Sequence, residues 1–95
     1  MNNIIAEDKL NKYFSISSEA IEMVKKSGFD EKRKKEALDF FDMATRYYSD
    51  AQHFKSKGDY VNAFAALNYA HGWLDAGARS GLFKVRNSRL FTVDD

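Results

Sequence analysis

The sequence predicts an all-α protein: an antiparallel three-helix, up-down-up bundle with a C-terminal tail packed on it. Apolar residues recur at helical spacing over three long segments, and Gly28 and Gly58 separate these segments. No proline interrupts them, and 95 residues make one domain with no room for a second. We therefore expect a single helical domain over residues 1–95, with helices at about 5–27, 30–57 and 59–82 and a tail at 83–95.

The first predicted helix is amphipathic. Apolar residues from Leu10 to Val24 recur every three or four positions, and lysines and glutamates occupy the rest of the helical wheel. Gly28 can take the left-handed backbone conformation, and the two lysines before it suit the negative end of the helix dipole. The sequence therefore predicts that this helix ends just before Gly28, with Phe29 folding back on Val24.

The second and third predicted helices are complementary in side-chain size. Asp30 offers an oxygen to cap the second helix, whose stripe consists of Phe40, Phe41, Ala44, Tyr47, Tyr48, Ala51 and Phe54. Nine of the residues from Tyr60 to Gly81 are alanine or glycine, which allows close backbone approach. Gly58 ends the second helix and Asp59 caps the third, and so short a connection requires the two helices to lie antiparallel.

The third predicted helix has almost no polar side. Its inner face centres on Leu67, and the opposite face, which is polar in most surface helices, carries Val61, Ala65, Tyr69, Gly72, Trp73 and Ala76. A helix that is apolar all round is normally buried all round. We therefore expect the tail or another chain to cover this face.

The function predicted from this face is that of a non-enzymatic interaction module. It would form a homo-oligomer or dock a protein partner. The predicted protein interface consists of Val61, Ala65, Tyr69, Trp73 and Ala76.

An alternative function follows from the distribution of charge. An up-down-up bundle gathers ten of the fifteen basic residues at one end, partly offset by Asp30, Glu31 and Glu36. The ten are Lys25, Lys26, Lys32, Arg33, Lys34, Lys35, Arg79, Lys84, Arg86 and Arg89. A basic patch can bind nucleic acid or another phosphate ligand, whereas the simpler interpretation is a solvated face that aids solubility. The residues predicted for polyanion binding are Lys32, Arg33, Lys34, Lys35, Arg79, Lys84 and Arg86. No aromatic residue interleaves the basic run, so base stacking is not indicated.

Evidence for catalysis or metal binding is sparse. His71 and Asp75 lie one helical turn apart and form the one candidate catalytic pair, but no nucleophile accompanies them and a structural role explains them better. His53 falls near the other end of the hairpin, so the two imidazoles should not share a metal. Gly72, Gly77 and Gly81 lack the spacing of a phosphate loop and are attributed to close helix packing. We predict no catalytic, metal or cofactor-binding residues and no cofactor.

Composition adds limits of its own. Without cysteine the chain has no disulfide, thiolate nucleophile or thiolate metal site, and a formal net charge of +1 gives no global attraction to polyanions. Neither a secretion signal nor a run of about 18 apolar residues is visible. We expect a cytoplasmic protein that does not associate with membranes.

Two resemblances involve the third predicted helix. The run GDYVNAFAALNYAHGWLDAGARSGLF, together with the aromatic segment from Tyr47 to Phe54 before it, resembles the archaeal family called domain of unknown function 357 over residues 37–83. The resemblance implies a small all-helical archaeal protein without an assigned activity, and it transfers no site residues. A weaker resemblance links residues 58–70 to a tetratricopeptide hairpin, but Asp75 stands where that motif expects proline, so we attribute it to shared hairpin physics.

Overall fold

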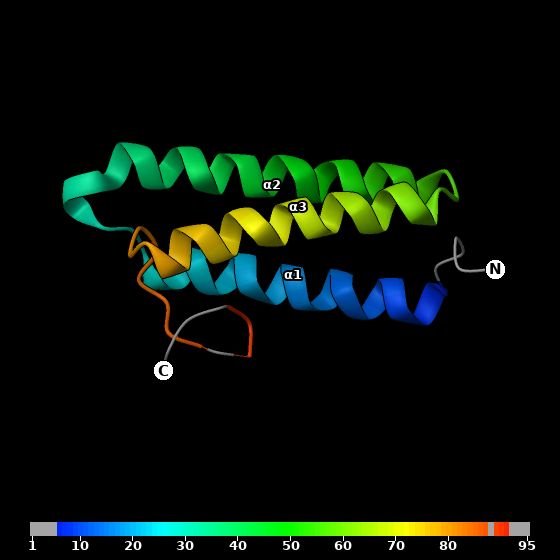
Figure 1. Cartoon of the computed structure of the whole chain (residues 1–95), viewed down its shortest axis with the longest axis horizontal. Coiled ribbons are helices and arrows are strands. Elements are labelled where there is room, and N and C mark those ends of the chain that lie inside the picture. The colour runs from blue at the N-terminus through cyan, green and yellow to red at the C-terminus, as the bar shows by residue number, and fades with distance from the viewer. Residues whose placement is uncertain (1–5, 88, 92–95) are drawn as a thin grey trace.

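The computed structural model describes residues 6–87 and 89–91. Its helices are α1 (Glu7–Ser27), the short 3-10 helix η1 (Glu31–Arg33), α2 (Lys34–Ser56) and α3 (Tyr60–Arg79). Figure 1 shows the three long helices side by side along the longest axis of the molecule, which measures 46 × 24 × 19 Å. The described residues contain no strand, and the predicted all-α antiparallel bundle with a packed tail is confirmed.

Local sequence signals fix most of the helix ends. Gly28 adopts a φ of 88°, and its N–H donates to the carbonyl oxygen of Val24 at 2.9 Å, which ends α1. Asp59 caps α3, because its carboxylate accepts from the backbone N–H of Asn62 at 3.2 Å. Asp30 caps η1 instead of α2, through the N–H of Lys32. The predicted start of the first helix at residue 5 lies outside the described residues.

The prediction for the end of the third helix was wrong by three residues. The helix ends at Arg79 and not at 82, because Gly81 takes a φ of 80° and the chain leaves the helical path. Leu82 and Phe83 consequently belong to the tail, and both are buried.

The seam of α2 against α3 is built of alanine. Ala37, Ala44 and Ala51 of α2 are fully buried, spaced seven residues apart. The aromatic rings of α2 are only half-buried and flank this seam on two sides: Phe40 and Tyr47 towards the outer side of α3, Phe41 and Tyr48 towards α1 and the tail. The sequence predicted the aromatic stripe of α2 directly against the small residues of α3. In the structure small residues of α2 lie at the centre of this contact, and its aromatic rings lie on the two flanks.

The first part of the tail contacts two other parts of the bundle, the connection that follows α1 and the last turns of α3. Phe83 forms an isolated antiparallel bridge with Phe29, and its N–H donates to the carbonyl oxygen of Gly77 at 3.1 Å. Its ring lies where a Cβ on residue 77 would stand, with three ring carbons within 2.6 Å of that position. Gly77 therefore accommodates the tail and not a neighbouring helix.

The later part of the described tail returns along α1. Leu90 and Phe91 are buried in the same cluster as Ala20 and Ile21, and Arg89 forms an ion pair with Glu19. The tail therefore covers the side of the bundle next to α1.

Candidate functional site

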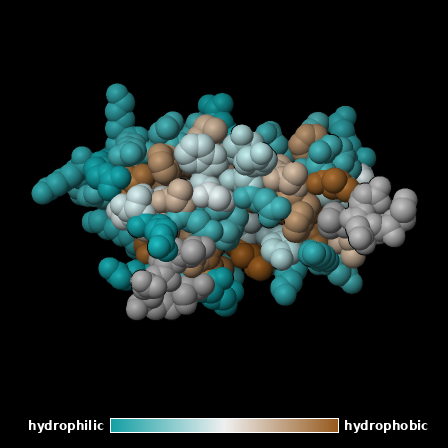
Figure 2. All heavy atoms as spheres, in the orientation of Figure 1, coloured by the Kyte–Doolittle hydropathy of each residue, from teal (hydrophilic) through white to brown (hydrophobic). Residues whose placement is uncertain are grey.

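One candidate surface is the outer face of α3, which we define as Val61, Ala65, Tyr69, Gly72 and Ala76. All five residues are exposed, with Tyr69 at 63% and Val61 at 48%. Figure 2 shows a band of pale and brown residues across the middle of the molecule, along the line that α3 follows in Figure 1. We expected the tail or another chain to cover this face, and the described part of the tail does not, because Arg89, Leu90 and Phe91 pack beside α1. Cover by another chain stays a prediction.

Trp73, the sixth residue of the predicted face, is covered from a direction that the sequence did not indicate. It is half-buried, and its ring meets that of Phe40 edge-on, with centroids 5.0 Å apart and planes at 84°. One turn earlier, Tyr69 stacks on Tyr47 with centroids 5.2 Å apart. Aromatic rings of α2 thus border the outer face of α3 along one edge and fix the orientation of Tyr69, although Tyr69 remains exposed.

A second candidate surface lies where the end of α1, the start of α2 and the end of α3 meet, at the left of Figure 1. Strongly hydrophilic residues dominate this end in Figure 2. We call it the basic pole, consisting of Lys25, Lys26, Lys32, Arg33, Lys34, Lys35, Arg79, Lys84 and Arg86. The seven residues predicted for polyanion binding all belong to these segments. Arg89 does not, because its ion pair with Glu19 holds it alongside the middle of α1.

Some cations of the basic pole have evident structural roles. Arg33 is bonded to Glu36 at 3.2 Å, and its Nη1 donates to the carbonyl oxygen of Ser80 at 2.9 Å, which ties η1 to the end of α3. Lys25 pairs with Glu22 at 3.3 Å. For the side chains of six others, no described residue supplies a hydrogen bond or an ion pair; these are Lys26, Lys32, Lys34, Lys35, Lys84 and Arg86.

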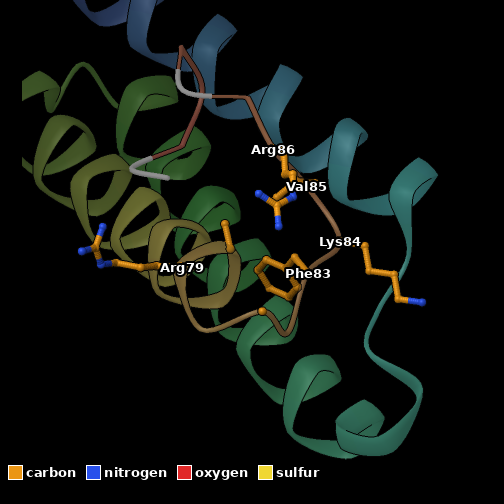
Figure 3. Close-up of a pocket in the computed structure, with 7 residues that line it drawn as sticks. Arg79, Phe83, Lys84, Val85 and Arg86 are labelled. Atoms are coloured by element: carbon orange, nitrogen blue, oxygen red, sulfur yellow. The ribbon is translucent and has the colours of Figure 1, made fainter. Parts of the chain in front are cut away.

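The basic pole contains a pocket of about 720 Å³ between the end of α3 and the tail. Figure 3 shows Arg79 and Lys84 extending away on opposite sides, with Phe83 and Arg86 between them. The ring of Phe83 is 1% exposed, so the accessible side chains of the pocket are the three cations. This arrangement suits an anionic ligand.

The candidate catalytic pair lies in a different groove, between α1 and α3. His71 Nε2 stands 3.6 Å from Asp75 Oδ1, and both side chains are 28% exposed. That separation is too long for a hydrogen bond. The groove of about 410 Å³ also includes Tyr13, Ser17 and Arg89. Ser17 is buried and no hydrogen bond joins it to His71 among the described residues, so the groove lacks the activated nucleophile that covalent catalysis requires.

Metal binding has no geometric support in the described part of the chain. No group of three histidine, aspartate, glutamate or cysteine side chains converges there. His53 is exposed near the end of α2, beside the ring of Phe54, whereas His71 lies in the second half of α3.

Comparison with known proteins places the chain in a family. The family described as protein of unknown function (DUF357) matches residues 12–83. The chain belongs to DUF357. No curated protein and no solved structure matches it significantly. The match extends the resemblance seen at residues 37–83 through most of α1, and the family's description supplies no role for any residue. Within residues 6–87 and 89–91, no helix combines the length and apolar character that a membrane span requires.

Sequence reasoning about this DUF357 chain missed two features of its surface. The tie from Arg33 to Ser80 joins residues 47 positions apart, and nothing in the local pattern indicates it. The groove near His71 includes Arg89 beside Tyr13 and Ser17 of α1. The position of Arg89 depends on the return path of the tail, which has no helical periodicity to follow.

Proposed function

We propose that this DUF357 protein is a non-enzymatic interaction module that pairs with a second copy of itself through the outer face of α3. The observation that carries the proposal is the exposure of Val61 and Tyr69, at 48% and 63%, on one side of α3. The one formally charged residue between Asp59 and Arg79 is Asp75, which lies in the groove towards α1 and not on this side. Burying exposed apolar surface of this kind lowers the free energy by about 25 cal/mol per Å². Residues 82–87 and 89–91 of the tail do not provide that cover.

A second copy suits this surface because its two ends carry opposite charges at equal distances from Tyr69. Tyr69 stands ten positions from both Asp59 and Arg79. If two copies of α3 pack antiparallel about Tyr69, Asp59 approaches the partner's Arg79, and the helix dipoles also oppose one another. The small residues Ala65 and Gly72 leave room for the facing aromatic side chain. Such a two-fold interface is the commonest form of homo-oligomer.

The dimensions of α3 indicate a weak dimer. A helix of 20 residues is about 30 Å long and about 10–12 Å across, so one face offers roughly 300–360 Å². Two such faces give about 600–700 Å², below the roughly 1,200 Å² at which stable interfaces begin. Tyr47 and Trp73 at the edge add to this area. We therefore expect association at micromolar or higher concentrations.

Sedimentation equilibrium between about 10 μM and 1 mM tests the proposal. The wild-type mass should rise towards that of a dimer, and Ala65→Glu should remain monomeric because pairing would bury an uncompensated charge. Gln52→Glu introduces the same charge at an exposed position of α2 and should associate as the wild type does. A monomer at every concentration would overturn the proposal, and so would equal association of Ala65→Glu and wild type.

The proposal assigns no chemistry to His71 and Asp75, and it places the protein in the cytoplasm. The lack of cysteine supports an intracellular setting.

A further inference from the structure

We propose that the basic pole binds the phosphate backbone of double-stranded nucleic acid without reading its sequence. This function uses mostly different residues from self-association, because the pole lies at the ends of the helices and the outer face follows the length of α3; Arg79 belongs to both. Nine cations of the pole stand against six carboxylates on the same segments, those of Glu22, Asp30, Glu31, Glu36, Asp39 and Asp75. Since the whole chain has a formal charge of only +1, positive charge is concentrated at this end.

Stability of the fold explains only part of this cluster. Lys25 and Lys26 favour the negative end of the α1 dipole, and Arg33 is bonded to Glu36 and Ser80. Lys32, Lys34 and Lys35, however, surround the start of α2, where the dipole disfavours cations. No described carboxylate pairs with them. Their clustering is therefore better explained by an external anion than by the folded chain.

The chemistry of the pole favours a duplex over other polyanions. A peripheral membrane protein inserts several apolar side chains beside its cations. Among the described residues near the pole, Leu38 is the large hydrophobic one that is exposed, at 46%, whereas Phe83 and Val85 of the pocket are buried. One exposed leucine provides little apolar area for insertion. A single-strand binder stacks bases on exposed aromatic rings. At this end Phe29 and Phe41 are half-buried and Phe83 is buried, and the three rings pack against one another. Long, flexible cationic side chains around the pocket can reach the phosphates on the outside of a duplex.

The number of cations matches the number of phosphates within reach. The two shorter dimensions of the molecule, 24 and 19 Å, bound the width of the pole. Duplex DNA carries one phosphate per about 1.7 Å of axis, so roughly 11–14 phosphates span that width and about half of them face the protein. This corresponds to the six cations without partners in the described chain. Six contacts predict a slope of about −5 for the logarithm of affinity against the logarithm of salt concentration.

Fluorescence anisotropy with labelled 20-base-pair DNA and RNA duplexes, over about 50–200 mM salt, tests this inference. The key variant changes Lys32, Lys34 and Lys35 to glutamine and keeps Arg33, which holds Ser80. Its slope should fall from about −5 to about −3, and its affinity at 0.1 M salt should fall on the order of 10²- to 10³-fold. Two duplexes of unrelated sequence should bind equally.

A matched variant separates local contact from net charge. Lys9, Lys12 and Lys57 are exposed at the opposite end of the bundle, and changing them to glutamine removes the same total charge. This variant should keep the wild-type slope. Equal losses in the two triple variants would overturn the inference, as would no duplex binding at 50 mM salt. Tighter binding to single strands or to phosphatidylserine vesicles than to duplex would also refute it. Ala65→Glu should bind duplex as the wild type does, so the outcome is independent of self-association.

Discussion

The position of Phe83 depends on the missing Cβ of Gly77. In Gly77→Ala the new carbon would lie within 2.6 Å of three ring carbons, whereas nonbonded carbons normally stand about 3.5–4.0 Å apart. The ring must move by about 1 Å, although the backbone N–H of Phe83 donates a hydrogen bond to the carbonyl oxygen of residue 77 and holds the chain in place. Overpacking costs about 1–3 kcal/mol, and complete expulsion of the ring about 3–5 kcal/mol. The gain in helix propensity, about 1 kcal/mol, is smaller. We expect net destabilisation of about 0–4 kcal/mol, in contrast to a stabilising effect at a glycine that has room for a Cβ.

Gly72→Ala is the matched control for this substitution. Gly72 lies in the same helix, and a Cβ there would meet nothing within 4 Å. The same chemical change should therefore stabilise the protein by about 0.5–1 kcal/mol. Urea unfolding followed by circular dichroism, at a protein concentration low enough to keep the chain monomeric, measures both free energies of unfolding.

A double-mutant cycle locates the cause. In the background Phe83→Ala the clash is absent, so Gly77→Ala should become neutral or stabilising. If Gly77→Ala in the wild-type background is as stable as Gly72→Ala, the ring of Phe83 does not fill the space beside Gly77, and the proposed packing of the tail is refuted.

Two further predictions concern how distant segments are held together. Leu90→Ala should lower the free energy of unfolding by about 2–5 kcal/mol because the side chain is 1% exposed, whereas Arg89→Gln should lower it by at most about 1 kcal/mol because its ion pair with Glu19 is exposed. Equal losses in urea unfolding would show that the ion pair and not burial holds the tail. Arg33→Gln should destabilise by about 1 kcal/mol through loss of the bond to Ser80, while Lys32→Gln should leave the unfolding midpoint unchanged; a shift in Lys32→Gln as large as in Arg33→Gln would contradict this.

The parts of the fold that the sequence predicts correctly are those with local causes. The end of α1 follows from Gly28 and the start of α3 from Asp59, and both signals act within one helical turn. The end of α3 and the tail have non-local causes. Leu82 and Phe83 are set by contacts with Gly77, Phe29 and Asp30, which no periodicity reveals.

The glycines of α3 show the same limit. Sequence analysis gave Gly72, Gly77 and Gly81 one explanation, close helix packing, and the structure gives them three different situations. Gly77 receives the ring of Phe83, Gly81 takes a positive φ, and Gly72 faces open space. Spacing along a helix cannot distinguish these cases, because each depends on what lies opposite the glycine.

The sequence predicts where the two candidate surfaces lie, but not which neighbouring side chains cover or border them. Helical periodicity places Val61, Tyr69 and Trp73 on one side of α3, but it cannot give the lateral offset of α2 that covers Trp73 with Phe40. Up-down-up topology likewise brings the basic segments to one end. It cannot show that the tail turns back along α1 and takes Arg89 away from that end.

The positions of the two proposed surfaces have a consequence for any assembly. Antiparallel pairing along α3 would direct the basic poles of the two copies to opposite ends of the dimer, because each pole lies at one end of the 46 Å long axis. The two poles could not then contact one short stretch of duplex together, so dimerisation would add no avidity on a 20-base-pair fragment. It would instead connect two separate duplexes, and light scattering from mixtures with duplex should rise for the wild type but not for Ala65→Glu.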